Sequence, residues 1–222
     1  MIAIDGPAGA GKSTLASSLA RKFGFLNLET GAMYRALALK AVENDISVDD
    51  EAALFNLAQD AKIVLEPKLG GNRVFLDSMD VSQRIREKDV TDAASRVSVH
   101  PRVREWMVNL QRKMGEQGGV VMEGRDIGTV VFPDAEVKIF LDADPEVRGN
   151  RRFVQVGESV PTKAAAIVEE LRARDHRDRN RANSPLAPAP DAVIIDSTHM
   201  SFEQVMEKAE ELVRKSTGAS IA

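Results

Sequence analysis

The sequence opens with "MIAIDGPAGAGKST" (residues 1–14), and this stretch sets the architecture. Residues 6–13 fit the pattern G-x-x-x-x-G-K-[ST], and they stand between an apolar, strand-like run and a helix-like run. A phosphate-binding loop requires this order, because the N–H groups of the turn and of the helix N-terminus must face one anion. The stretch therefore predicts a nucleoside triphosphate site.

Each part of this loop has an expected role. The glycines allow the tight turn, Lys12 is expected to reach the β- and γ-phosphates from a solvent-facing loop, and Ser13 is expected to ligate Mg²⁺. The residues expected to line the triphosphate are Gly6, Pro7, Ala8, Gly9, Ala10, Gly11, Lys12, Ser13 and Thr14.

Short apolar runs recur along the chain and are separated by long helix-like segments. Runs that are apolar on both faces are typical of a parallel sheet covered by helices on both sides. We therefore expect one three-layer α/β domain over residues 1–222. The five runs are residues 1–5, 25–28, 119–123, 137–143 and 192–196.

One region breaks this alternation. Residues 62–81, "KIVLEPKLGGNRVFLDSMDV", read as two strands around a Gly-Gly turn with a short third strand at "MDV". We interpret residues 62–95 as an antiparallel insert, which is either a packing embellishment or a subdomain on the substrate side.

Composition narrows the class of protein. The formal net charge of -4 and a pI near 5.5 disfavour a general nucleic-acid binder, which usually carries a basic surface. The chain has no cysteine, no apolar run near the roughly 18 residues of a membrane span, and no signal-peptide pattern at Met1. We expect a cytoplasmic monomer without nucleic-acid or membrane partners.

The reaction is suggested by what accompanies the loop. The chain lacks the Asn-Lys-x-Asp loop of GTP switches and the Ser-Gly-Gly signature of transporter ATPases, but it offers arginines where a second anion would sit. None of the three histidines is placed as a general base, and a phosphomonoester acceptor needs none because it is already anionic at pH 7. A small-molecule kinase is therefore favoured.

The run "RARDHRDRNR" (residues 172–181) is either a solvated helix face or one wall of this site. Helical spacing puts Arg174, Asp178 and Arg181 on one face, with Arg177 beside them. Asp175 falls elsewhere and is expected only to balance neighbouring arginines.

Six motifs in order resemble the bacterial cytidylate kinases, a family of P-loop nucleoside monophosphate kinases, over residues 1–214. The resemblance implies a P-loop kinase fold with a five-stranded parallel sheet, an insert on the nucleoside monophosphate side and a lid at about 145–165. It also implies transfer of the γ-phosphoryl group of ATP to CMP or dCMP with Mg²⁺, in pyrimidine nucleotide metabolism. The motifs are "DGPAGAGKST" (5–14), "ETGAMYRALA" (29–38), "AASRVSVHPRVRE" (93–105), "MEGRDIGTVVFPDA" (122–135), "KIFLDA" (138–143) and "RDHRDRNRA" (174–182).

Two other functions remain open on the sequence. One is a P-loop kinase for another small acceptor, such as UMP or a sugar acid. The other is a nucleotide-dependent binding module that has no productive acceptor.

The resemblance assigns the acceptor contacts residue by residue. Cytosine contacts fall on Ser95, Arg104 and Asp126, which suits a base with an amino donor at N4 and acceptors at N3 and O2. The remaining contacts are Arg35, Arg125 and Arg181 for the CMP phosphate, Arg174 and Asp178 for the pentose, and Thr30 beside the acceptor.

The same resemblance suggests the catalytic and lid residues. The catalytic set is Lys12, Arg125, Arg151 and Arg181. Arg148, Arg151 and Arg152 look like lid residues that close over ATP, with Arg151 favoured for transition-state charge; the alternative is that they are exposed helix arginines. Glu29 departs from the family, which usually has aspartate there, and Glu123 is the leading candidate to support the Mg²⁺ shell.

Overall fold

A computed structural model of the protein describes residues 1–68, 71–156 and 164–217. Its main sheet has five parallel strands in the order β2-β6-β1-β7-β8. The strands are β1 (Ile2–Asp5), β2 (Leu26–Glu29), β6 (Val120–Gly124), β7 (Val137–Asp142) and β8 (Val193–Asp196). All five apolar runs of the sequence are thereby confirmed as strands of one parallel sheet.

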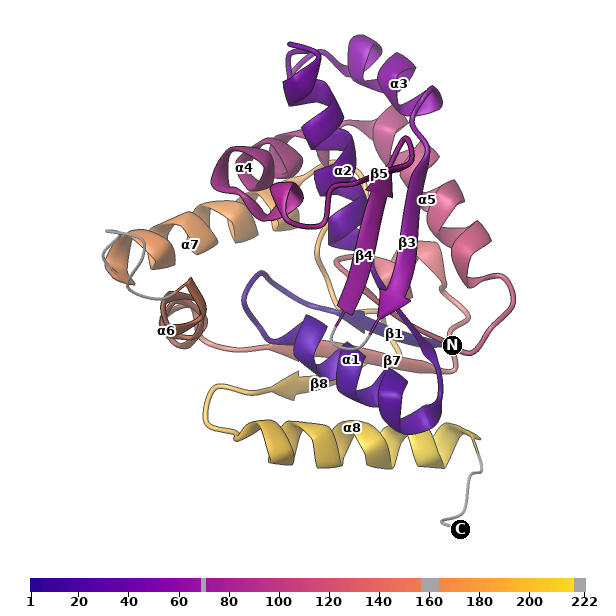
Figure 1. Cartoon of the computed structure of the whole chain (residues 1–222). Coiled ribbons are helices and arrows are strands. Elements are labelled where there is room, and N and C mark those ends of the chain that lie inside the picture. Colours follow the sequence, from indigo (N-terminus) through magenta and orange to yellow (C-terminus); the bar gives the residue numbers. More distant parts are fainter. Residues whose placement is uncertain (69–70, 157–163, 218–222) are drawn as a thin grey trace.

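Helices cover both faces of this sheet (Figure 1). Ile2 and Ile4 of β1 face a core shared with α1 (Lys12–Phe23) and α8 (Phe202–Thr217), whereas Ala3 faces the core on the other side. Successive residues of a strand point to opposite faces, so an apolar β1 needs cover on both. The predicted three-layer α/β architecture is confirmed.

The helix boundaries follow local signals. Helix α1 is followed by Gly24, whose φ of 69° is left-handed, and Ser201 and Gln204 form a reciprocal cap before α8.

The acceptor side of the molecule is mainly helical. Met107, in the helix over residues 101–115, is fully buried. The elements here are α2 (Thr30–Glu43), α3 (Glu51–Gln59), a 3₁₀ turn (Arg84–Arg86), α4 (Lys88–Val97) and α5 (Pro101–Gly115).

The predicted antiparallel strands form a separate sheet. It consists of β3 (Ile63–Lys68), β4 (Gly71–Leu76) and β5 (Met79–Asp80). The strands end well before residue 95, however, and the second half of the 62–95 range is helical. Val90, Ala94 and Val97 recur at helical spacing and are all buried, and this periodicity favours a helix over a third long strand.

Asn72 of β4 joins this small sheet to the edge of the main one. Its side-chain amide donates to the Asn27 carbonyl at 2.7 Å, and its oxygen accepts from the Glu29 N–H at 3.0 Å. These are the bonds that a further strand would make, so Asn72 satisfies part of the open edge of β2. The insert therefore fixes the strand end that leads into the acceptor site.

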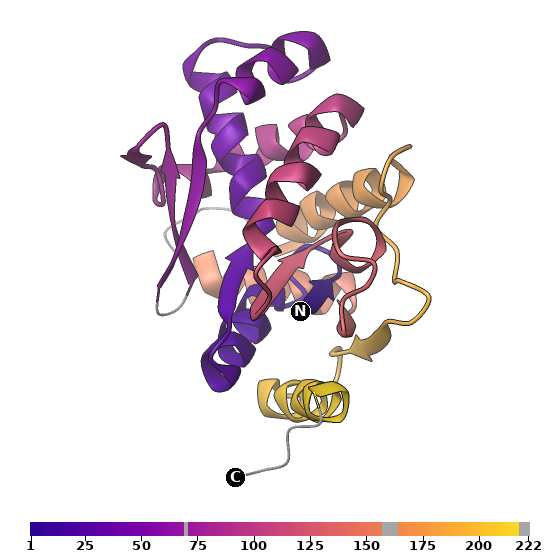
Figure 2. The same cartoon turned by 90° about the vertical axis from the view of Figure 1, so that its right-hand side faces the viewer.

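Helix α6 (Pro145–Val156) stands where the lid was expected, and α7 (Ala164–Asn180) begins at the end of that range. They pack closely, because a Cβ on Gly149 would lie 2.3 Å from a methyl group of Val168. Part of the predicted lid, residues 157–163, lies outside the described residues. Figure 2 shows α7 and the β3–β4 hairpin on opposite sides of the molecule. Among the described helices, none is both long and apolar enough to cross a membrane.

Candidate active site

The glycine-rich loop lies where the sequence predicts it, between β1 and α1. Gly6 has a φ of 145°, and a Cβ at this position would lie 2.0 Å from the Leu141 carbonyl oxygen of β7. Only glycine fits there, because the backbone of the loop crosses directly against the neighbouring strand. The loop leads directly into the N-terminus of α1, which begins at Lys12. Backbone N–H groups at this end of the helix are available to phosphate oxygens.

Lys12 is buried, with 5% of its surface exposed, and the expectation of a solvent-facing lysine is wrong. It is the first residue of α1, and its ammonium group donates to the Pro7 carbonyl at 2.7 Å. Burial, helped by the nearby Arg125 guanidinium, lowers the pKa of Lys12 to about 7. The loop folds over its own lysine, which leaves this cation short of negative partners.

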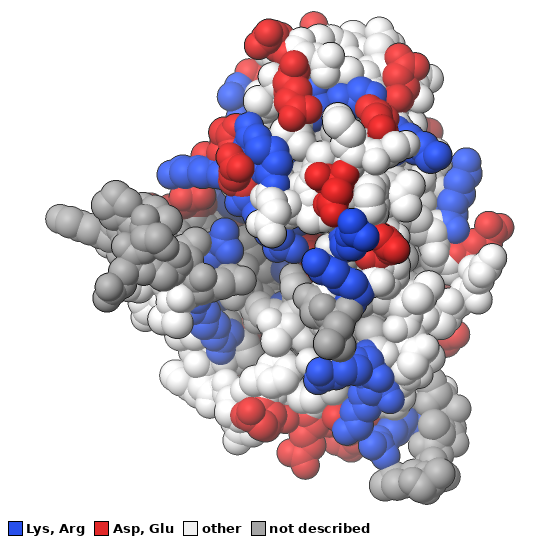
Figure 3. Space-filling view, viewed as in Figure 1, with Lys and Arg blue, Asp and Glu red and all other residues white. Residues whose placement is uncertain are grey.

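Further cations gather around Lys12. Arg125 follows β6, Arg174 comes from α7, and burial together with Arg125 lowers the pKa of Arg174 to about 10. The Arg174 Nε atom makes no hydrogen bond within the described ranges. Buried like charges are costly unless an anion joins them, so this cluster is suited to an anionic ligand. In Figure 3, basic side chains border the hollow between the upper and lower parts of the molecule.

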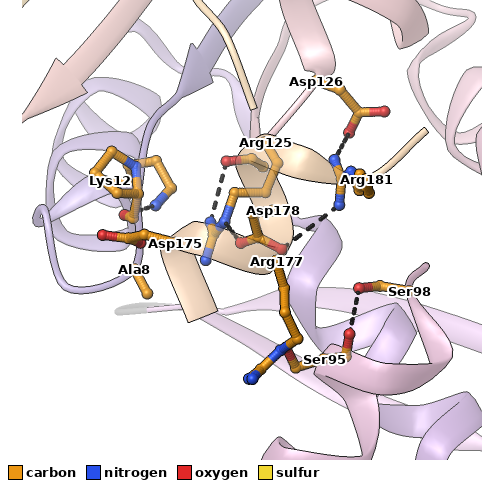
Figure 4. A network of polar contacts seen from close by, with 12 residues as sticks. Ala8, Lys12, Ser95, Ser98, Arg125, Asp126, Asp175, Arg177, Asp178 and Arg181 are labelled. Atoms are coloured by element: carbon orange, nitrogen blue, oxygen red, sulfur yellow. Dashed lines mark hydrogen bonds and ion pairs between the residues drawn. The ribbon is translucent and has the colours of Figure 1, made fainter. Parts of the chain in front are cut away.

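The predicted base and sugar residues meet in one buried network (Figure 4). Asp126 pairs with Arg104 of α5 and lies 3.9 Å from Arg181, while Asp178 accepts from Arg125 Nε at 2.9 Å. Asp178 and Arg181 are also 3.7 Å apart. The face that helical spacing predicted within residues 172–181 is therefore the inward one, although Arg181 lies one residue beyond the end of α7.

Two further side chains join this network without a role assigned from the sequence. Arg177 of α7 donates from Nε to the Ser95 hydroxyl of α4 at 3.2 Å, which connects two walls of the site. The Tyr34 ring lies under Arg104, and its buried hydroxyl has no partner among the described residues. Burial raises the pKa of Tyr34 to about 12, so this hydroxyl is a neutral donor. Tyr34 stands next to Arg35 in its motif, which was the available signal.

Glu29 and Thr30 lie where β2 meets α2. Thr30 is buried and donates its hydroxyl to the Glu123 carbonyl at 2.7 Å. Although burial opposes ionisation, the Arg35 guanidinium lowers the pKa of Glu29, and the two side chains form an ion pair. A phosphate that binds Arg35 therefore has to compete with the Glu29 carboxylate.

The residues near Ser13 fit a magnesium ion. Burial and the neighbouring Glu29 raise the pKa of Glu123, and one Glu123 carboxyl oxygen has no hydrogen-bond partner in the described part of the chain. Hydroxyl and carboxylate oxygens are ligands that Mg²⁺ prefers, and it commonly binds through few protein ligands plus substrate phosphates. No group of three or more His, Cys, Asp or Glu side chains that could hold a metal occurs in the described ranges.

Arg148 and Asp175 form a buried pair that the sequence did not reveal. Arg148 Nη2 lies 2.7 Å from the Asp175 carboxylate, and Nη1 donates to the Ala8 carbonyl of the glycine-rich loop at 2.9 Å. Asp175 was expected only to balance neighbouring arginines of its own helix, but it is 7% exposed and its partner Arg148 belongs to another helix. The pair joins α6 and α7 to the loop.

The other two lid arginines lie apart from the cation cluster. Arg151 donates both terminal nitrogens to Ser197, to its hydroxyl at 3.0 Å and its carbonyl at 2.7 Å, in the loop after β8. Arg152 is exposed. A role of Arg151 at the transferring phosphoryl group therefore requires it to leave Ser197.

Replacing Asp175 with alanine is expected to lower the free energy of unfolding by about 3–5 kcal/mol, because Arg148 would stay buried without its partner. Urea denaturation measures this loss. Glu169→Ala is the matched control, since it removes an exposed partner of Arg172 from the same helix and should change stability by less than about 1 kcal/mol. Equal losses in both variants would contradict the buried-pair interpretation.

A triphosphate-binding loop that opens onto a second, arginine-lined anion site is the arrangement of a P-loop kinase acting on a phosphorylated acceptor. Comparisons with known proteins agree. The family model described as cytidylate kinase matches residues 2–215. The chain therefore belongs to the cytidylate kinase family.

Individual relatives match over nearly their whole length. A cytidylate kinase of Syntrophotalea carbinolica is 47% identical over 96% of this chain and 91% of its own. One from Pelotomaculum thermopropionicum is 50% identical over 93% and 92%. Among solved structures, an uncharacterized protein from Eubacterium ventriosum covers 98% of both chains with a TM-score of 0.50 and 15% identity, a likeness of fold alone.

Proposed function

We propose that this protein transfers the γ-phosphoryl group of ATP to CMP or dCMP, giving ADP and CDP or dCDP. The observation that carries the proposal is the buried Asp126, held between Arg104 and Arg181 on the acceptor side of the glycine-rich loop. Burying a carboxylate is costly, so we attribute its presence at this position to a contact with the base of the acceptor.

The proposed base reading follows from hydrogen-bond complementarity. The Asp126 carboxylate accepts from the N4 amino group of cytosine, and the Arg104 guanidinium donates to N3 and O2. Arg104 Nε has no partner within the described chain, so donor capacity remains. Uracil presents a carbonyl at position 4 and an N–H at position 3, which opposes both groups. The Ser95 hydroxyl is proposed as the third contact.

The arginines are proposed to divide the nucleotide between them. Arg35, Arg125 and Arg181 hold the CMP phosphate, while Arg174 and Asp178 hold the pentose. Because Arg125 and Asp178 bond to each other in the free site, binding of CMP exchanges this internal pair for contacts to phosphate and sugar. Thr30 is proposed to lie beside the bound acceptor.

The proposed chemistry needs charge stabilisation and no general base. The acceptor phosphate attacks as an anion, and its approach to the γ-phosphate is opposed mainly by repulsion. Lys12, Arg125 and Arg181 supply positive charge around the in-line transfer, with Arg151 proposed to add to it. Mg²⁺ held by Ser13 would supply further charge at the ATP phosphates.

The proposed site is complete within one chain. The glycine-rich loop, the turn after β6, helices α2, α4, α5, α6 and α7, and the residue after α7 together supply every proposed contact, so we propose that the monomer is active. ATP and CMP are intracellular metabolites, and we propose a cytoplasmic protein that acts without nucleic-acid or membrane partners.

A coupled assay of ADP release over a panel of acceptors tests the proposal. CMP and dCMP should give turnover at least about tenfold above UMP, because each unpaired buried group costs about 1–3 kcal/mol. Gluconate serves as the sugar acid in the panel. Preference for UMP or gluconate would support the alternative kinase, and absence of acceptor-stimulated turnover would support a binding module.

A further inference from the structure

Asp5 is a buried carboxylate between the donor loop and the acceptor loop. It is the last residue of β1, it is 5% exposed, and the next residue, Gly6, begins the glycine-rich loop. Its Oδ1 accepts from the Ile127 N–H at 2.8 Å and its Oδ2 accepts from the Gly128 N–H at 2.7 Å. Both carboxylate oxygens are therefore bonded to the residues that follow Asp126.

The segment that Asp5 holds turns sharply. Asp126 has φ -146° and ψ 25°, and a single turn of π-helix follows over Ile127–Val131. The first N–H groups of any helical turn lack acceptors within the turn. Here the Asp5 carboxylate accepts from two of them. Space beside Gly128 is limited as well, because a Cβ there would lie 3.2 Å from Lys138 Cδ.

We propose that Asp5 is a positioning residue for base selection, which aims Asp126 at the cytosine amino group by fixing the two residues after it to β1. This inference rests on the proposed function. These bonds tie the turn that carries Asp126 to the end of β1, directly before the glycine-rich loop.

The chemistry requires a carboxylate at this position. Two N–H donors point at Asp5 and need two acceptor oxygens, but asparagine offers one oxygen and one amino group. The amino group would face a backbone N–H and turn that segment away. Burial raises the pKa of Asp5 to about 6, so the carboxylate form is the one present at neutral pH despite its cost.

Asp5→Asn tests the inference by steady-state kinetics with CMP, UMP and ATP. We expect the ratio of kcat/KM for CMP over UMP to fall about five- to a hundredfold, with a raised KM for CMP and a KM for ATP within about twofold of the original. Asp77→Asn is the matched control. It weakens another carboxylate bridge, to the Lys62 N–H and Lys40, far from the site, and should leave the ratio unchanged.

A double variant shows whether Asp5 acts through Asp126. The double variant Asp5→Asn with Asp126→Asn should have the same ratio of kcat/KM for CMP over UMP as Asp126→Asn alone. The contact between Asp126 and the cytosine amino group is already lost in the single variant, so Asp5 has nothing further to position. If Asp5→Asn does not fold, Asp5→Ser, which keeps one acceptor, gives the same readouts.

The outcomes separate the inference from the proposed function. An unchanged CMP to UMP ratio in the Asp5 variant, beside a reduced ratio in Asp126→Asn, overturns the role of Asp5 and leaves the proposed function standing. Equal rises in the KM for CMP and ATP with an unchanged ratio would mean a purely structural role. An unchanged ratio in Asp126→Asn overturns the base reading, and the inference with it.

Discussion

Lys12→Met is expected to lower kcat by about 10²–10³-fold while the protein stays folded. The lost ammonium group is the one expected to stabilise negative charge on the transferring phosphoryl group. Methionine keeps the unbranched shape of the side chain. Because burial and Arg125 already lower the pKa of Lys12 to about 7, removing its charge relieves repulsion in the free protein. The lost bond to the Pro7 carbonyl opposes this gain, so the free energy of unfolding should change by less than about 2 kcal/mol.

The measurement combines the ADP-release assay with urea denaturation. Lys22→Met is the control on the same helix, because Lys22 is half exposed and pairs with Glu210 of α8. It should retain full activity. Near-normal turnover of Lys12→Met would refute the assignment of the triphosphate site, and unfolding of this variant would refute the electrostatic argument.

Asp126→Asn is expected to reduce the kcat/KM ratio of CMP over UMP by about ten- to a hundredfold. Asparagine keeps the size of the side chain but presents either an oxygen or an amino group, so it satisfies cytosine and uracil similarly. The loss should appear mainly as a higher KM for CMP. Competition assays with both nucleotides measure the ratio directly.

Asp178→Asn is the informative control for this result. Asp178 belongs to the same buried network but is assigned to the pentose, which CMP and UMP share. Its replacement should raise the KM of both nucleotides and leave their ratio unchanged. If Asp178→Asn and Asp126→Asn alter the ratio equally, the division between base and sugar contacts is wrong.

The parts of the fold with local signals could be predicted from the sequence. The strand before Gly6 and the helix from Lys12 are fixed by a motif whose spacing leaves one arrangement, and the five strands are short apolar runs. The inward positions of Arg174 and Asp178 follow from helical periodicity, which is also local.

What could not be predicted depends on contacts between distant segments. Helix α7 has two buried faces, one toward the phosphate site and one toward α6, and periodicity alone identified only the first. Asp175 lies on the second face with Arg148, and nothing near either residue in the sequence announces their pairing. Lys12 was expected at the surface because loops usually are, whereas this loop closes over it.

Single polar residues at element ends escaped prediction for the same reason. Asn72 and Asp5 each bond to backbone groups of a segment far away in the chain, by 45 and 122 positions respectively. Such contacts have no periodicity and no characteristic spacing. The range of residues 62–95 was too long for an antiparallel insert. Its strands are followed by a helix with no glycine or proline between them to mark the boundary.

The cation cluster links substrate binding to the packing of the fold. Lys12, Arg125 and Arg174 come from three separate segments, and burial and Arg125 contribute to the lowered pKa values of Lys12 and Arg174. Under the proposed function, the nucleotides contact these segments through their phosphates and the pentose, so each bound nucleotide acts as a removable crosslink between α1, the turn after β6 and α7. Release of the products then removes this crosslink.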